Sequence, residues 1–166
     1  MAPPDVDFGR IVATLLEHRV RFVLIGGLAA LAHGSPFPTE DVDVTPERSA
    51  ENLAKLSAAL KELGARIRTD AVEGGLAFDH DAESLAAAGV WNLTTQHGDL
   101  DLSFVPDGTQ GYPDLVRGAR DTEIFGVVVP IASLEDIVRS KQAANRPKDQ
   151  RVLPTLRELL ANLDTR

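Results

Sequence analysis

Phe22–Val44, with the sequence FVLIGGLAALAHGSPFPTEDVDV, combines short apolar segments with a Gly-Gly pair and a loop that contains two prolines. Its first four residues, Phe22–Ile25, predict a strand, because a short apolar run that ends in glycine is typical of a buried strand. The Ala-rich segment Leu28–Ala32 predicts a short helix, and the prolines after it require a loop. Glu40–Val44 then predicts a second strand.

Two acidic residues, Asp41 and Asp43, lie on the second of these strands. Because strand side chains alternate between faces, both carboxylates share one face. Such a pair repels unless it is protonated or bridged by a cation, which predicts a site for Mg²⁺ or Mn²⁺. The Gly26-Gly27 turn lets backbone amides approach an anion beside the N-terminus of the short helix. Together these features indicate phosphoryl or nucleotidyl transfer.

The chain has 166 residues, which is the size of one domain, and its 43% apolar and 25% charged residues are ordinary for a globular protein. It has no cysteine, which excludes a disulfide framework and thiolate metal sites. No apolar run reaches the length of a membrane span, and residues 1–7 lack the pattern of a signal peptide. We therefore expect a cytoplasmic protein.

The net charge of −8 is unevenly distributed. Residues 1–138 carry a charge of −12, whereas residues 139–157 carry six basic residues against one acidic residue and a charge of +5. A general nucleic-acid binder would be basic over a broad face, and this chain is not. A local cationic segment facing an acidic site suits a nucleoside triphosphate and its metal.

The rest of the chain mixes helices and strands without regular alternation. We expect a single α+β domain over residues 1–166, with a mixed or antiparallel sheet flanked by helices, most simply on one side. The expected helices are Asp7–Arg19, a helix that starts at Thr45-Pro46 and ends at Gly64, Glu83–Ala88, Pro113–Arg120, a helix capped by Ser133, and Lys148–Leu163. The expected strands are Ala65–Arg68, Val90–His97, Asp99–Val105 and one strand or a hairpin in Glu123–Pro130, and Gly74-Gly75 predicts a turn.

The spacing of Gly26-Gly27, thirteen further residues and Asp41-Val42-Asp43 resembles the signature of the DNA-polymerase-beta-like nucleotidyltransferase superfamily. GGLAALAHGSPFPTEDVDV is similar to minimal bacterial nucleotidyltransferases that include abortive-infection and toxin–antitoxin proteins. The segment SLEDIVRSKQAANRPKDQRVLPTLREL resembles the helical C-terminal part of the same group. The resemblance implies metal-dependent transfer of a nucleoside monophosphate from an NTP to a hydroxyl group.

The superfamily also requires a third carboxylate on a neighbouring strand, between apolar residues. Leu100-Asp101-Leu102 fits this form, and Asp99 lies on the same face two residues earlier. We favour Asp101. By resemblance, Asp41 and Asp43 would hold two metal ions with Asp101, which would also help to deprotonate the attacking hydroxyl.

Lys141 continues the inward stripe of its expected helix, which is formed by Leu134, Ile137 and Val138. A lysine there must extend to solvent or meet an anion, so we predict a triphosphate contact. The other predicted nucleotide-binding residues are Gly26, Gly27, Arg146, Lys148 and Asp149. Asp149, as the resemblance implies, would accept a hydrogen bond from Lys141. Residues 133–163 would then complete the nucleotide site.

Several alternatives remain open from the sequence. The acceptor is an RNA such as tRNA, a protein or a small molecule, and a toxin of a toxin–antitoxin pair, with its cognate antitoxin as partner, is one form of this function. Leu28 follows the second glycine where many members of the superfamily have serine, and Phe37 lies where relatives often carry arginine. Both favour a non-catalytic nucleotide- or partner-binding module. A nucleotide-sugar glycosyltransferase is a third alternative. Separately, His33 is expected to cap a loop rather than bind a metal.

Overall fold

The computed structural model describes residues 6–165, and every structural statement below concerns these residues. The helices are α1 (Phe8–Glu17), α2 (Gly26–Ala32), α3 (Ala50–Glu62), α4 (Ala82–Ala86), α5 (Tyr112–Gly118), α6 (Leu134–Ala144) and α7 (Pro147–Asp164). The strands are β1 (Phe22–Ile25), β2 (Asp41–Pro46), β3 (Arg66–Thr69), β4 (Val72–Leu76), β5 (Val90–Thr95), β6 (Gly98–Ser103), β7 (Arg120–Ile124) and β8 (Val127–Ile131). Among these helices, none combines the length and apolarity needed to cross a membrane.

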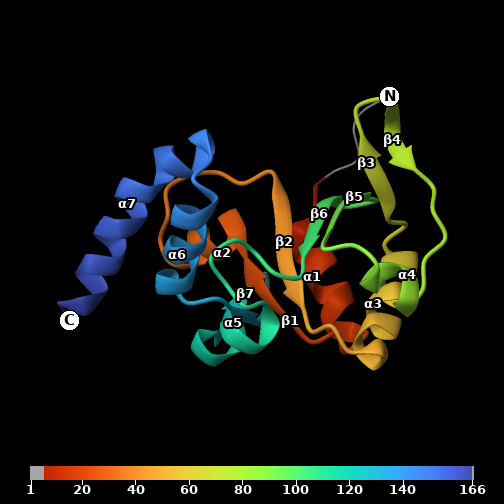
Figure 1. Cartoon of the computed structure of the whole chain (residues 1–166), viewed down its shortest axis with the longest axis horizontal. Coiled ribbons are helices and arrows are strands. Elements are labelled where there is room, and N and C mark those ends of the chain that lie inside the picture. Colours follow the sequence, from red (N-terminus) through yellow and green to blue (C-terminus); the bar gives the residue numbers. More distant parts are fainter. Residues whose placement is uncertain (1–5, 166) are drawn as a thin grey trace.

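All eight strands form one mixed sheet in the order β4-β3-β5-β6-β2-β1-β8-β7. Strand β2 lies near its middle, antiparallel to β1 and parallel to β6. Helices α6 and α7 lie at one end of the molecule, and β3 and β4 lie at the other end (Figure 1). The predicted α+β class with a mixed sheet is confirmed.

The core forms around the central strands. Phe22, Val23 and Leu24 of β1 are all buried, and since consecutive side chains point to opposite faces, both faces of the sheet are covered here. Helices α2 and α5 contact β1, and α1 contacts the flanking strands β2 and β8. The expectation of helices on one side fits β5 better, where Val90 and Asn92 are exposed and Leu93, on the other face, is buried. The sheet is therefore open on one face near β5 and closed around β1.

The expected helix start at Thr45-Pro46 is wrong. Both residues belong to β2, where Thr45 pairs with Val23 and Pro46 pairs with Phe22 of β1. The helix begins later, at α3, where the side chain of Ser49 caps the backbone N–H of Asn52. Pairing with β1 therefore outweighs the local capping signal, and Ser49 supplies an equivalent cap four residues further on.

Both Gly-Gly pairs differ from their expected roles as turns. Gly26 and Gly27 form the first turn of α2 itself, so this helix starts two residues earlier than predicted. Gly74 and Gly75 lie inside the edge strand β4, and the turn before it falls at residues 70–71. In both cases the backbone conformation that glycine allows is used within a regular element.

Candidate active site

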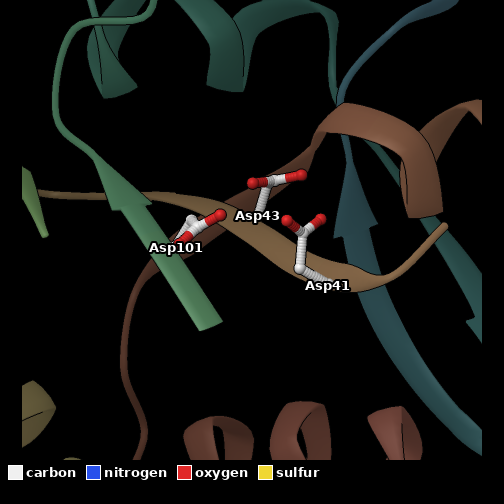
Figure 2. Close-up of side chains that lie close together, drawn as sticks. All are labelled: Asp41, Asp43 and Asp101. Carbon is white, nitrogen blue, oxygen red and sulfur yellow. The ribbon is translucent and has the colours of Figure 1, made fainter. Parts of the chain in front are cut away.

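Three carboxylates from two neighbouring strands converge at the centre of the sheet. Asp41 and Asp43 lie on β2, and Asp101 on β6 is the direct neighbour of Asp43 in the parallel register. Each residue offers an oxygen within 4.8 Å of the oxygens of the other two. Their side chains point toward one another (Figure 2). We call these three residues the acidic triad.

Glycine at position 26 allows Asp43 to occupy its place. Gly26 has a φ of +70°, and a Cβ atom there would lie 2.8 Å from the Cβ of Asp43, closer than any side chain tolerates. A Cβ atom on Gly27 would lie 2.8 Å from Oγ1 of Thr39, whose hydroxyl donates to the backbone oxygen of Asp41. The Gly-Gly pair therefore lets α2 begin directly against the acidic strand.

The protonation of the triad reflects burial and mutual repulsion. Burial, followed by the charges of Asp41 and Asp101, raises the pKa of Asp43 to about 8, although Lys148 opposes this shift. Burial and the neighbouring Asp41 carboxyl raise the pKa of Asp101 to about 6, against the lowering effect of Arg68. Lys148 and Arg68 therefore do not fully offset the burial and the mutual repulsion of the three carboxyl groups.

The triad has the donor chemistry that a divalent cation prefers. Carboxylate oxygens are hard ligands typical of Mg²⁺ and Mn²⁺. Within residues 6–165, Arg68 is the only basic residue whose nitrogen lies within 4.0 Å of a triad oxygen. Three clustered carboxylates with one ion-pair partner fit a metal ion better than a purely structural network.

A second charged cluster lies where α6 meets α7. Asp149 is fully buried, and it accepts hydrogen bonds from the backbone and the guanidinium of Arg146, at 3.1 and 2.8 Å. Lys141 Nζ lies 3.6 Å from Asp149 Oδ1. Burial alone would raise the pKa of Asp149, but the contacts with Arg146 and Lys141 outweigh it and lower that pKa. Asp149 thus holds two cations in place.

One cavity of about 720 Å³ connects the two clusters. All but one of the predicted site residues line it, namely Gly26, Gly27, Asp41, Asp43, Asp101, Lys141, Arg146 and Lys148. The exception is Asp149, which is buried behind Lys141 and Arg146 and is absent from the lining. The sequence therefore identified residues that the fold brings together from positions more than a hundred residues apart.

The cavity also has lining residues that the sequence analysis did not single out. Arg68 and Asn92 come from β3 and β5, on the open side of the sheet. The strand order that brings Arg68 near Asp101 leaves no local signal, since β5 lies between β3 and β6 in the sheet and Arg68 precedes Asp101 by 33 residues. His33 Nε2 is hydrogen-bonded to the backbone oxygen of Ala132, in accord with a structural role.

No protein-family model and no curated protein sequence matches the chain. Three solved structures are similar in fold. The lincosamide antibiotic adenylyltransferase LnuA, bound to lincomycin, has a TM-score of 0.62 and 15% identity over 93% of this chain and 99% of that chain. ANT(2'')-Ia in complex with adenylyl-2''-tobramycin has a TM-score of 0.54 and 16% identity over 95% of each chain.

The third structure, named a "putative nucleotidyltransferase" from Thermotoga maritima, has a TM-score of 0.52 and 20% identity over 93% of this chain and 91% of that chain. At these identities the similarity concerns the fold. None of the three names refers to a toxin–antitoxin or abortive-infection system. The chain has the fold of solved nucleotidyltransferases, over nearly its whole described length.

Proposed function

We propose that this protein is a nucleotidyltransferase that moves a nucleoside monophosphate from an NTP to an acceptor hydroxyl. The observation that carries the proposal is the convergence of Asp41, Asp43 and Asp101 in one cavity with Lys141 and Lys148. Clustered carboxylates beside cations are what a metal-bound triphosphate needs. The fold shared with LnuA and ANT(2'')-Ia supports the same assignment.

In the proposed reaction the acceptor oxygen forms a bond to the α-phosphorus, and the bond from that phosphorus to the β-phosphate oxygen breaks. Pyrophosphate leaves, and the hydroxyl proton passes to the carboxylate of Asp101. Asp41, Asp43 and Asp101 would hold Mg²⁺ or Mn²⁺, which supplies charge neutralisation for the phosphates and the attacking oxygen.

The cationic side of the cavity would bind the triphosphate. Lys141 and Arg146 are held by the buried carboxylate of Asp149. Lys148, at the start of α7, contributes a positive charge that opposes the raised pKa of Asp43. Asp149 acts in this proposal as a positioning residue, because no part of it lines the cavity. Gly26 and Gly27 line the same cavity, so their backbone would be the part of α2 that phosphate oxygens approach.

A small molecule with a free hydroxyl group is the acceptor that the observations favour. LnuA is bound to lincomycin, and ANT(2'')-Ia is bound to an adenylylated tobramycin, so both similar folds hold small molecules. The net charge of −12 over residues 1–138 also disfavours a polyanionic acceptor such as tRNA. A toxin role, with tRNA or protein as acceptor and a cognate antitoxin as partner, would depend on the cationic segment 139–157.

The test uses α-³²P-labelled ATP, GTP, CTP and UTP with Mg²⁺ and four acceptors: lincomycin, tobramycin, bulk tRNA and the protein itself. We expect labelled product and pyrophosphate from at least one NTP, and neither with Asp43→Ala or after treatment with EDTA. Transfer that persists in Asp43→Ala would contradict the proposed site.

A non-catalytic nucleotide-binding module is the second candidate, favoured by Leu28 at the position after the Gly-Gly pair, where no hydroxyl is available. The same NTPs distinguish it. Thermal stabilisation by an NTP with Mg²⁺, without labelled product from any acceptor and without pyrophosphate, would support binding alone.

A further inference from the structure

Arg68 reaches from β3 across β5 to two carboxylates of β6. Its Nη2 donates to Asp101 Oδ1 at 2.7 Å, and its Nη1 lies 3.4 Å from Asp99 Oδ2. Nη1 also donates to the backbone oxygen of Leu93 on β5, at 3.0 Å. The guanidinium is therefore anchored on the intervening strand and bridges both acidic residues, while a third of its side chain stays exposed.

The sheet alone does not distinguish Asp99 from Asp101. Both lie on the same face of β6, and each is the direct neighbour of an acidic residue on β2, since Asp41 pairs with Asp99 and Asp43 pairs with Asp101. Within residues 6–165, however, only Asp101 joins Asp41 and Asp43 in a cluster with metal-binding geometry. A feature outside β2 and β6 must therefore separate the two candidates.

We propose that Arg68 is a positioning residue that selects Asp101, and not Asp99, as the third carboxylate of the site. This inference builds on the proposed function. The short bond from Nη2 fixes the orientation of Asp101, and the longer contact from Nη1 keeps Asp99 occupied on the side of β5. Guanidinium suits this role because it is planar, permanently charged and able to bond two carboxylates at fixed angles.

Without Arg68 the site would gain a fourth competing carboxylate. Asp99 would be free to turn toward Asp41, its neighbour on β2, and one positive charge would be lost. A divalent cation would then bind more tightly but in more than one arrangement. The transfer step would slow, whereas NTP binding, which depends on Lys141 and Lys148 across the cavity, would change little.

The test compares four proteins: the natural chain, Arg68→Met, Asp99→Asn and the double variant. Mn²⁺ affinity is measured by electron paramagnetic resonance without nucleotide, and kcat and KM are measured for NTP. We expect Arg68→Met to bind Mn²⁺ about fivefold more tightly and to lose about 10- to 100-fold in kcat, with KM within about twofold. Asp99→Asn alone should change both quantities by less than about twofold.

The double variant provides the decisive comparison. Removing Asp99 as a competitor should return Mn²⁺ affinity toward the natural value and recover part of the kcat lost in Arg68→Met. Arg66→Met is the matched control, because Arg66 lies on the same strand, donates to the backbone oxygen of Gly75 and forms no ion pair with a carboxylate of residues 6–165.

The proposal is overturned if Arg68→Met resembles Arg66→Met in Mn²⁺ affinity and kcat, or if Asp99→Asn brings no recovery in the Arg68→Met background. Should Arg68→Met fail to fold, Arg68→Lys keeps the charge but loses the two-pronged geometry. It should retain natural Mn²⁺ affinity with a reduced kcat, and natural values of both would refute selection by Arg68. If the natural chain binds Mn²⁺ but transfers nothing, the proposed function fails, and the Mn²⁺ series still decides the role of Arg68.

Discussion

Two aspartates of this protein, the fully buried Asp149 and the half-buried Asp43, have pKa values shifted in opposite directions. Asp149 lies between Arg146 and Lys141, which lower its pKa, whereas Asp43 lies between Asp41 and Asp101, and burial and these neighbours raise its pKa to about 8. Proteins normally pair a buried charge, because an unpaired one is strongly destabilising. The Asp149 cluster follows this rule, and the acidic triad departs from it.

The opposite pKa shifts of Asp149 and Asp43 indicate that Asp149 supports the fold, whereas Asp43 serves the proposed reaction. A carboxylate that the protein itself satisfies has little left to offer a ligand, and Asp149 is accordingly absent from the cavity. A carboxylate left among like charges is available to a cation from solution. Removing Asp149 should therefore impair folding, whereas removing Asp43 should impair activity and spare the fold.

The largest expected effect is on activity. Asp43→Asn should lower the rate of nucleotidyl transfer by about 1000-fold, because it removes a proposed metal ligand and a charge that the reaction needs. At pH 9 without metal, the same variant should have a melting temperature at least equal to that of the natural protein, because the repulsion within the triad is relieved. A clear loss of stability there would show that Asp43 is structural.

The reverse pattern is expected at the junction of α6 and α7. Asp149→Asn leaves Arg146 and Lys141 without their buried partner and should reduce the free energy of unfolding by about 3 kcal/mol. Urea denaturation measures this change. Glu51→Gln is the control, since it removes only an exposed ion pair with Lys55 and should change stability by less than about 0.5 kcal/mol. Equal effects of the two substitutions would contradict the support role of Asp149.

Gly26→Ala tests whether Asp43 can keep its place in the acidic triad when residue 26 carries a side chain. The substitution adds strain at a φ of +70° and a clash with Asp43, and should destabilise the protein by about 2 kcal/mol while reducing metal binding. Gly74→Ala isolates the backbone contribution, because Gly74 has a φ of +79° and nothing within 4 Å of the added methyl group. Both are measured by urea denaturation and Mn²⁺ titration, and unchanged Mn²⁺ affinity in Gly26→Ala would refute the steric role.

The smallest expected effect is a pH dependence of stability. Because the pKa of Asp43 is raised to about 8, the folded protein binds more protons than the unfolded chain up to that pH. The free energy of unfolding should therefore fall as pH rises from 6.5 to 9 without metal, lowering the melting temperature by a few degrees. Mg²⁺ should remove most of this decline, and Asp43→Asn should lack it. Calorimetry with and without Mg²⁺ provides the measurement.

Local patterns were sufficient to predict the acidic strand and its partner. Phe22–Ile25 forms the strand with the predicted bounds, and Asp101, which the resemblance to the nucleotidyltransferase superfamily favoured over Asp99, does join Asp41 and Asp43. The strand follows from a short apolar run that ends in glycine, and the shared face of Asp41 and Asp43 follows from alternation, both of which the sequence displays directly. Alternation does not choose between Asp99 and Asp101, and the resemblance supplied that choice.

Features that depend on strand order or packing were not predictable in the same way. The contact of Arg68 with Asp101 requires β5 to lie between β3 and β6, and the extension of β2 through Thr45 requires pairing with β1. The complete burial of Asp149 requires the close packing of α7 on α6. The first two join residues more than twenty positions apart, and the third depends on how two consecutive helices pack. Composition and periodicity carry no information about either.

The tight fit between residue 26 and Asp43 has a consequence for reading related genes. Because even one methyl group at position 26 would collide with Asp43, these two positions form a joint signature that can be checked without a structure. Homologues that keep both residues should retain the proposed metal-binding acidic triad. Homologues with a larger residue at position 26 should lack it, whatever the rest of their sequence resembles.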